Sequence, residues 1–213
     1  MQKLSPCLEI LPVAQRRLWS ELDQVPDEFV LYGGTAIALQ LGHRQSIDFD
    51  FFGNRPFDPR KLQTAIPFLT KARVRQLEKN TLTASLDRGG PVTVSFFGVP
   101  HLPRLAPPLI SDDNGVRIAS LLDLAGTKAS VVQVRAEAKD YLDIDALITK
   151  GRTTLPMALA AAQALYGASF NPQITLKALS FFDDGDLQSL PEECKLRLVT
   201  AARDVDLDHL PDL

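Results

Sequence analysis

The hydrophobic pattern of the N-terminal part alternates between helices and short strands. Apolar positions between 8 and 22 recur at helical spacing and predict one helix. The apolar run 29–32 is typical of a buried strand, and two glycines follow it directly. A helix is expected over 35–41, where a further glycine ends the pattern. Residues 47–52 alternate strictly between two kinds of side chain, which predicts a strand with two different faces.

The pattern continues with one helix, three strands and then a loop-like segment. We expect a helix over 58–69, and strands near 74–77, 82–86 and 92–97. Residues 101–115 contain three prolines and an Asp-Asp-Asn-Gly run, so they are predicted to form a linker or surface loop.

The remaining chain is helical almost throughout, which divides the sequence into two parts. Helices are predicted over 119–134, 136–149, 155–166 and 171–181, and a weaker one after Pro191. The prediction is therefore an α+β fold with a mixed β-sheet and flanking helices in residues 1–115, followed by a helical domain in residues 116–213.

Composition places the chain among globular proteins of a reducing compartment. The chain has 213 residues, of which 45% are apolar, and its longest apolar run, of about eleven residues, is too short to cross a bilayer. Polar residues interrupt the N-terminus, so no secretion leader is expected. Cys7 and Cys194 offer neither a disulfide framework nor a CxxC metal site, and three scattered histidines exclude a zinc site. We expect a cytoplasmic protein without a membrane partner.

Charge is distributed unevenly along a chain whose net charge is −3. Residues 55–88 carry eight bases and three acids, whereas residues 183–213 carry nine acids and three bases. The basic segment is expected to face a polyanion, which the acidic tail would repel. The alternative is two ordinary solvated surfaces of opposite sign.

Asp48 and Asp50 give the strongest chemical signal. Two residues apart on a strand, they leave the same face with their Cα atoms ~7 Å apart. Carboxylates that converge to ~4 Å repel by about 4 kcal/mol at an effective dielectric of 20, and a divalent cation removes that penalty. Oxygen ligands suit Mg²⁺, so the pair is a candidate metal site. The alternative is an exposed polar strand face.

Gly33, Gly34 and Thr35 lie where the first strand runs into a helix. Bare backbone N–H groups at a helix N-terminus favour phosphate, and the Thr35 hydroxyl is a further donor. The alternative for Thr35 is a helix cap. The segment is neither a Walker A loop nor a GxGxxG fingerprint.

The stretch from Leu31 to Phe52 resembles the AbiEii/AbiGii-type nucleotidyltransferase toxins of abortive-infection and toxin–antitoxin systems, on the block Gly-His-Arg-x-Ser-x-Asp-x-Asp that ends at Asp50. The resemblance implies a nucleotidyltransferase-like fold and transfer of a nucleoside monophosphate from an NTP, with Mg²⁺ or Mn²⁺, to an acceptor hydroxyl. RNA is the expected acceptor, with tRNA 3′ ends foremost and a protein hydroxyl next. It also implies a cognate antitoxin as partner. Arg44 and Ser46, which belong to the same block, are candidate nucleotide-binding residues.

The resemblance continues through residue 184. It covers Asp123-Leu-Ala-Gly-Thr-Lys128, then Lys139-Asp140-Tyr-Leu-Asp143, and a weaker block at 179–184. It implies that Lys128 neutralises phosphate charge, and that Asp140 or Asp143 completes the catalytic site; we favour Asp140. Asp123 and Asp143 are secondary candidates.

The helical positions of these residues allow other readings. Lys128 has apolar neighbours one turn away on both sides, so it lies on the inward stripe and needs a partner. That partner is a nucleotide phosphate or a structural carboxylate, unless the side chain extends to the surface. Asp143 alternatively forms a surface pair with Lys139. Arg44 either binds the triphosphate through two hydrogen bonds or forms a stabilising ion pair.

One departure from the wider superfamily leaves the general base unassigned. The matching later strand offers Thr93 and Ser95 where other members carry a third carboxylate. Two alternatives to a toxin-type transferase therefore stay open. One is a non-catalytic nucleotide-binding or protein-interaction module, and the other is a small-molecule, antibiotic-type nucleotidyltransferase.

Overall fold

The computed structural model describes residues 2–213, and its contacts divide the chain into two compact units. Unit 1 comprises residues 2–103 and 107–119, and unit 2 comprises residues 104–106 and 120–213. The chain passes into unit 2 at Ser120, close to the predicted boundary at 115–116. Whether each unit is an independent domain stays a prediction.

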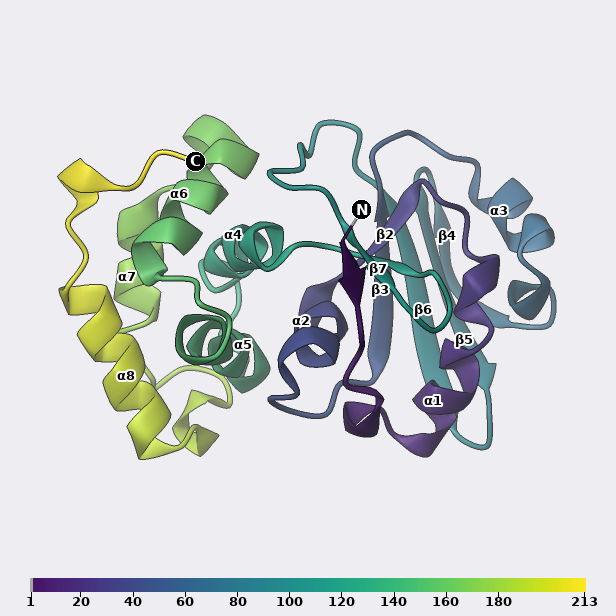
Figure 1. The fold of residues 1–213 in the computed structure, drawn as a ribbon, viewed down its shortest axis with the longest axis horizontal. Coiled ribbons are helices and arrows are strands. Elements are labelled where there is room, and N and C mark those ends of the chain that lie inside the picture. The colour runs from purple at the N-terminus through teal and green to yellow at the C-terminus, as the bar shows by residue number, and fades with distance from the viewer. Residues whose placement is uncertain (1) are drawn as a thin grey trace. The chain divides into compact units, whose positions relative to one another are not determined.

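Unit 1 is built on a mixed sheet of eight strands in the order β1-β7-β8-β2-β3-β6-β5-β4 (Figure 1). β3 pairs antiparallel with β2 and parallel with β6; β5 then pairs antiparallel with β6 on one side and with β4 on the other. The predicted mixed sheet is therefore confirmed. The strands are β1 (Lys3–Leu4), β2 (Phe29–Tyr32), β3 (Asp48–Gly53), β4 (Arg73–Glu78), β5 (Thr81–Asp87), β6 (Pro91–Gly98), β7 (Leu109–Ser111) and β8 (Arg117–Ile118).

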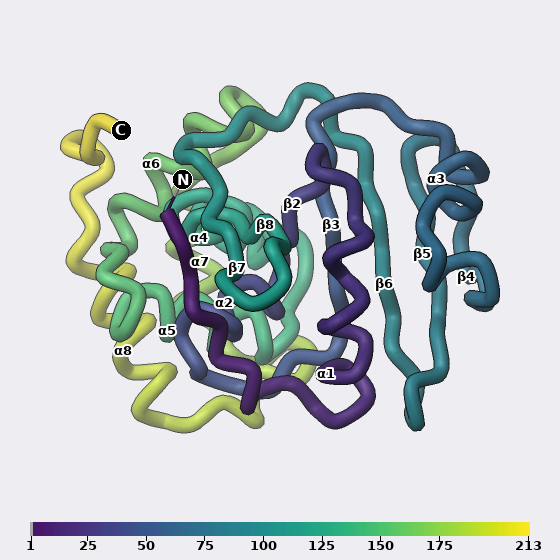
Figure 2. Tube along the Cα trace, turned by 45° about the vertical axis from the view of Figure 1, so that its right-hand side comes forward, coloured from purple at the N-terminus to yellow at the C-terminus, as the bar shows by residue number. Residues whose placement is uncertain are grey.

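Three helices flank this sheet: α1 (Val13–Trp19), α2 (Gly33–Leu41) and α3 (Pro59–Ala65). α1 packs on the apolar face, where Trp19 stacks on Phe49 with ring centroids 6.3 Å apart. α3 begins at the side-chain cap of Asp58 and lies beside β4 and β5, at the far end of the sheet in Figure 2. α2 connects β2 to β3 and ends at Gly42, whose positive φ of 58° suits glycine.

The predicted single helix over 8–22 is wrong. A short 3-10 turn, Leu8–Ile10, precedes α1, and a second one follows at Leu22–Gln24. Pro12 lies between the first turn and α1, and it cannot donate the backbone hydrogen bond that a continuous helix requires. The apolar stripe is nevertheless buried at Leu11, Leu18 and Leu22.

The predicted linker over 101–115 is wrong in part, because it contains β7. β7 pairs parallel with β1 at the N-terminus and antiparallel with β8. The predicted helix over 58–69 also ends early: α3 stops at Ala65, and a separate 3-10 turn, Pro67–Leu69, follows it. Pro67 begins this turn, and it lacks the backbone N–H that would continue α3.

The predicted helical region of residues 116–213 is confirmed from Ser120 onward, whereas its first residues include β8, which pairs with β2 and β7 in the sheet of unit 1. The helices of unit 2 are α4 (Leu121–Val131), α5 (Ala138–Thr149), α6 (Leu155–Tyr166), α7 (Pro172–Ala178) and α8 (Glu192–Arg203), with short 3-10 turns at Gly167–Ser169, Leu187–Ser189 and Leu207–His209. Side chains of Ser120, Thr154 and Asn171 cap the starts of α4, α6 and α7. α4 packs closely on α6, since a Cβ at Gly126 would lie 2.8 Å from Leu165.

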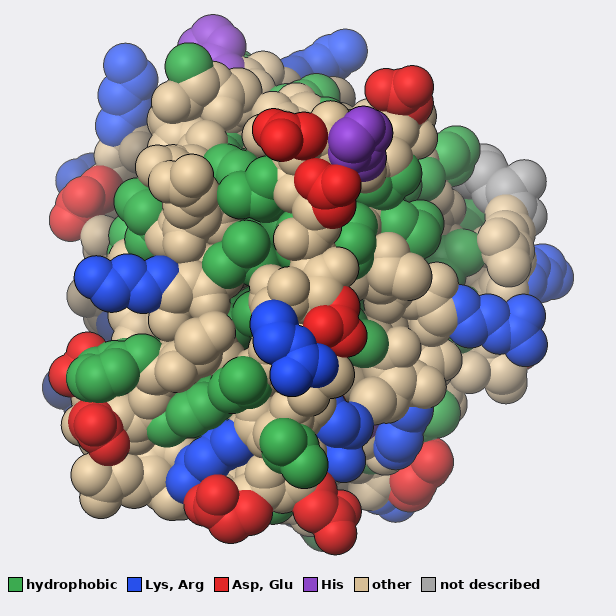
Figure 3. Space-filling model, turned by 90° about the vertical axis from the view of Figure 1, so that its left-hand side faces the viewer, with side chains coloured by type: hydrophobic (Ala, Val, Ile, Leu, Met, Phe, Trp, Pro, Cys, Tyr) green, Lys and Arg blue, Asp and Glu red, His purple; other side chains and the backbone are tan. Residues whose placement is uncertain are grey.

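Charged side chains of both signs are interspersed on the side of unit 2 that Figure 3 faces. In the part of the chain that the structure describes, no helix is long and apolar enough to cross a membrane.

Candidate functional site

Asp48 and Asp50 project from one face of β3, as the alternation predicts. The strand alternates between half-buried positions, which include both aspartates, and buried ones, which include Phe49 and Phe51. Register with β6 sets Asp48 beside Thr93 and Asp50 beside Ser95. The carboxylates therefore share a polar face of the sheet, while the two phenylalanines share the core.

Gly33 brings the start of α2 against Asp50. Its φ is +72°, a left-handed conformation that disfavours other residues, and a Cβ there would lie 3.1 Å from Oδ2 of Asp50. Gly34 follows in the first turn and is half-buried. Among the described residues no side chain caps this helix, so the N–H groups of its first turn suit an anionic ligand.

Thr35 and Ser46 fasten α2 to the start of β3. The Thr35 hydroxyl contacts Oγ of Ser46 at 2.7 Å and forms a short hydrogen bond to the carbonyl oxygen of Asp48. Both side chains are buried. Thr35 is therefore not the helix cap, which is Tyr32. The geometry gives Thr35 and Ser46 a positioning role, and direct nucleotide contact by either stays a prediction.

Arg44 lies half-buried in the loop between α2 and β3. Its guanidinium donates to the carbonyl oxygen of Gln45 at 2.9 Å. Ser46 lies in the same loop, which leads directly into β3 at Asp48. A contact between Arg44 and phosphate stays a prediction.

The residues present fit a Mg²⁺ ion held jointly with a substrate. Mg²⁺ is commonly bound by one or two carboxylates, with waters and substrate phosphates completing its shell, and Asp48 and Asp50 supply that number. Residues 2–213 contain no group of three or more metal-ligating side chains that could hold an ion alone. This agrees with the pairing of the two aspartates with Thr93 and Ser95 rather than with a third acid.

The Lys128 ammonium belongs to a buried ion cluster in unit 2. Nζ lies 2.5 Å from Oδ1 of Asp140 and 2.6 Å from Oδ2 of Asp143. Both carboxylates have no exposed surface, and Lys128 is 6% exposed. The inward position predicted for Lys128 is confirmed, and structural carboxylates are its partners within unit 2. A role toward phosphate stays a prediction.

Arg135 completes this cluster, and the sequence reasoning missed it. Its Nε and Nη2 atoms donate to Asp140 at 2.7 and 3.0 Å. Burial alone would raise the pKa of Asp140, but the hydrogen bonds and charges of Arg135 and Lys128 hold it below its usual value. Two inward-facing acids, Asp140 and Asp143, exceed the single charge of Lys128, and this imbalance is the sequence signal that could have indicated a second base such as Arg135.

The alternative of a surface pair between Lys139 and Asp143 is not what the structure shows. Lys139 instead pairs with Glu137 at 2.8 Å, because Asp143 turns inward to Lys128. Asp123 is 1% exposed and accepts hydrogen bonds from the backbone of Leu105 and Ala106 as well as from Ser120. It therefore fastens the start of α4 to that loop.

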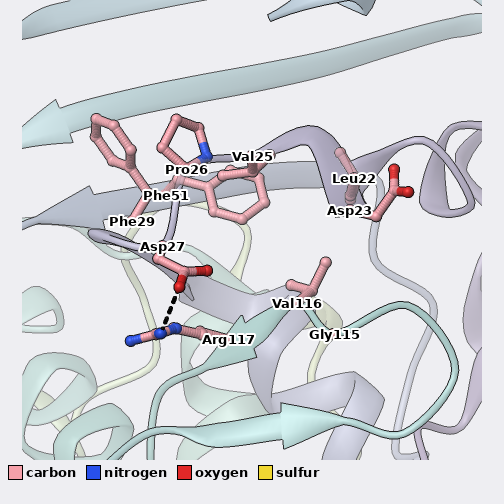
Figure 4. Close-up of a pocket in the computed structure, with 10 residues that line it drawn as sticks. All are labelled: Leu22, Asp23, Val25, Pro26, Asp27, Phe29, Phe51, Gly115, Val116 and Arg117. Atoms are coloured by element: carbon pink, nitrogen blue, oxygen red, sulfur yellow. Dashed lines mark hydrogen bonds and ion pairs between the residues drawn. The ribbon is translucent and has the colours of Figure 1, made fainter.

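A small cavity lies on the apolar side of the sheet, away from the aspartates. It measures about 30 Å³ and is bordered by Phe29, Phe51 and the ion pair between Arg117 and Asp27 (Figure 4). Such a volume holds about one or two water molecules and excludes a nucleotide.

Comparisons with known proteins agree with this architecture. The family model described as "Nucleotidyl transferase AbiEii toxin, Type IV TA system" matches residues 17–209. An uncharacterised protein of Aquifex aeolicus (strain VF5) is 33% identical over 160 residues, which cover 74% of this chain and 75% of the relative.

Two solved structures share the fold at low sequence identity. The nucleotidyltransferase toxin MenT4 of Mycobacterium tuberculosis H37Rv aligns with a TM-score of 0.61 at 15% identity, over 92% of this chain and 84% of its own. A crystal structure from H. pylori, described as that of a candidate nucleotidyltransferase, aligns with a TM-score of 0.57 at 18% identity, over 89% and 92%.

Proposed function

The chain belongs to the AbiEii family of nucleotidyltransferase toxins of type IV toxin–antitoxin systems, and from that premise we propose that it transfers a nucleoside monophosphate to a hydroxyl of RNA. The acceptor hydroxyl loses its proton to solvent as its oxygen attacks the α-phosphorus of an NTP, the bond to the β-phosphate breaks, and pyrophosphate leaves. The observation that carries the proposal is the pair Asp48 and Asp50 facing the uncapped N-terminus of α2, with Gly33 against Asp50.

Each residue of this arrangement has a proposed task. Asp48 and Asp50 would hold Mg²⁺, which neutralises and orients the triphosphate when bound. The backbone N–H groups of Gly33 and Gly34 bind phosphate oxygens, and Arg44 adds a guanidinium to them. Thr35 and Ser46 position β3 against α2 through the hydrogen bonds already described.

We propose that Lys128 and Asp140 contribute to nucleotide transfer through the buried ion cluster of unit 2. Their mutual contact at 2.5 Å fixes the lysine side chain, and Asp143 and Arg135 balance the remaining charge. Membership of the family also implies a nucleotide substrate and an antitoxin. We propose the 3′ end of a tRNA as the first acceptor to examine.

Transfer of label from each of the four α-labelled NTPs into cellular RNA and protein tests the proposal. We expect RNA to be labelled by the wild type, and Asp48→Asn and Asp50→Asn to slow labelling by a factor on the order of 10²–10³. Asp112→Asn is the matched control, because Asp112 is an exposed acid of the same unit. Wild-type rates in both site variants would remove the metal assignment.

The pairing of the aspartates with Thr93 and Ser95 favours one alternative, a nucleotide-binding module without transfer. Calorimetric titration with each NTP and Mg²⁺ separates the two. Binding that Asp48→Asn abolishes, without labelling of RNA or protein, would support the binding module.

A further inference from the structure

The sheet of unit 1 has two chemically different faces. On one face lie Phe49, Val94 and Ala84, which are neighbours across three strands and are fully buried. α1 packs on this apolar face, where Trp19 stacks on Phe49. The other face begins with Asp48 and Asp50 on β3, and we call it the polar face. α2 meets it at Asp50.

Strand register continues the polar face from the aspartates to the edge strand β4. Three rows of neighbouring residues cross β3, β6, β5 and β4 in turn: Asp48, Thr93, Ser85 and Arg73; Asp50, Ser95, Thr83 and Gln76; Phe52, Phe97, Thr81 and Glu78. Strands lie ~4.8 Å apart, so the backbones of Asp48 and Arg73 are separated by about 14 Å. A single extended strand of nucleic acid can span that distance.

A bulge in β4 adds a second arginine to this face. Register shifts between Val74 and Gln76, so two residues of β4 oppose one of β5. The shift allows Val74 and Leu77 both to turn toward the apolar face, although they are three residues apart. Arg75 is thereby exposed together with Gln76, and it joins Arg73 on the polar side.

Two aromatic rings lie next to the aspartates on the same face. Phe52 and Phe97 are neighbours in the third row, with ring centroids 5.2 Å apart, and both are half-buried. Phe52 also contacts Tyr32 at 5.0 Å, which supports its ring from the other side. Partly exposed rings on a sheet offer stacking surfaces for unpaired bases.

Most bases of residues 55–88 form no ion pair with a carboxylate in the part of the chain that the structure describes. Residues 55–88 carry seven exposed bases, and none of them forms an ion pair within residues 2–213. These bases are Arg55, Arg60, Lys61, Lys71, Arg73, Arg75 and Lys79. Arg88, by contrast, is held by Glu21 at 2.6 Å. Arg60 and Lys61 lie on α3, whereas Arg73 and Arg75 lie on β4 beside the polar face.

We infer that the polar face binds the acceptor as single-stranded RNA, with bases stacked on Phe52 and Phe97 and phosphates against Arg73 and Arg75. The inference rests on the proposed function, since it places the acceptor beside Asp48 and Asp50. Charge complementarity and partly exposed rings together favour unpaired nucleic acid over a protein partner, because a protein would not require both.

Fluorescence polarisation of a 5′-labelled single-stranded RNA ending in CCA, titrated with the full chain over a salt series, tests the inference. We expect the double variant Arg73→Gln/Arg75→Gln to bind on the order of tenfold more weakly, with the salt slope reduced by about 1.4. The matched control is Arg60→Gln/Lys61→Gln, which removes two bases from α3 and should leave both quantities unchanged.

The aromatic contribution is tested by Phe52→Leu/Phe97→Leu, which should weaken binding roughly tenfold or more without changing the salt slope. A duplex of the same sequence should bind more weakly than the single strand, since its bases are not available for stacking. The inference would be overturned if Arg73→Gln/Arg75→Gln and the control Arg60→Gln/Lys61→Gln lost RNA affinity equally. Equal binding of duplex and single strand would also overturn it.

Two results distinguish failure of this inference from failure of the proposed function. Labelling of RNA that requires Asp48 but is insensitive to Arg73→Gln/Arg75→Gln, with unchanged RNA affinity, would refute only the inference. RNA affinity that depends on Arg73 and Arg75, without labelling of any acceptor, would support the binding face and refute the transferase.

Discussion

Replacement of Asp140 by Asn should destabilise unit 2 far more than the same replacement at Asp145 on the same helix. Asp140 has no exposed side-chain surface and accepts from Lys128 at 2.5 Å and from Arg135 at 2.7 Å. Asp145 accepts two hydrogen bonds of 2.7 Å from Arg197, but its side chain is 13% exposed and that of Arg197 is 46% exposed. The hydrogen-bond geometry is therefore at least as good at Asp145, and burial is the difference.

Burial sets the expected magnitudes. Breaking a buried ion pair costs ~3–5 kcal/mol, and we expect about 3 kcal/mol for Asp140→Asn, because Lys128 keeps Asp143 at 2.6 Å. An exposed pair contributes less than about 1 kcal/mol, which bounds Asp145→Asn. A chain of this size loses ~2–4 °C of Tm per kcal/mol. The Tm should therefore fall by about 6–12 °C in Asp140→Asn and by at most about 4 °C in Asp145→Asn.

Urea and thermal unfolding followed by far-UV circular dichroism measure both changes. The pH dependence provides an internal check, because the pKa of Asp140 is lower in the native protein than its ordinary value of 3.8. The stability from this carboxylate is complete above that value and is lost as pH falls through the native pKa. The gap between wild type and Asp140→Asn should therefore be constant near neutral pH and narrow below about pH 4.

Two results would contradict this reasoning. One is a loss at Asp145→Asn that equals or exceeds the loss at Asp140→Asn. The other is a gap that widens as the solution is acidified. If Asp140 also serves catalysis, its Asn variant will lose transfer activity at temperatures well below its Tm, which a purely structural role would not produce.

Two further predictions use matched positions. Gly33→Ala should weaken NTP binding and should lower the free energy of unfolding more than Gly115→Ala does. Both glycines have a positive φ, but only at Gly33 would the new Cβ lie 3.1 Å from Oδ2 of Asp50. Equal losses of free energy in urea unfolding would refute this steric argument. Burial, reinforced by the negative charge of Asp145, raises the pKa of Cys194 to about 11. Iodoacetamide at pH 8 should therefore modify about one thiol per native chain, at Cys7, and peptide mass mapping locates it. Equal modification of Cys7 and Cys194 would contradict this.

The parts of the site that repeat at a fixed period could be predicted from the sequence. Alternation over 47–52 correctly separates Asp48 and Asp50 from Phe49 and Phe51, because a strand has only two faces. The apolar neighbours of Lys128 correctly predict its burial, because a helix repeats every 3.6 residues.

The parts that depend on distant pairing could not be predicted in this way. Arg135 reaches Asp140 from outside both helices, so no periodicity marks it. β1 and β7 are two and three residues long and are joined across about a hundred residues of sequence. The bulge at Arg75 appears in the sequence only as two apolar residues, Val74 and Leu77, whose spacing of three fits a helix rather than a strand.

The precision of the candidate metal site follows from the core behind it. Phe49 and Phe51 are fully buried, and Phe51 stacks on Phe96 with ring centroids 5.3 Å apart. A slip of β3 by one residue would expose both rings, at about 2–3 kcal/mol each, and would bury Asp48 and Asp50 at several kcal/mol each. The register is therefore fixed by roughly 10 kcal/mol or more, although the carboxylates themselves contribute little to folding. Substitutions that loosen the apolar face should consequently impair nucleotide transfer before they unfold the chain.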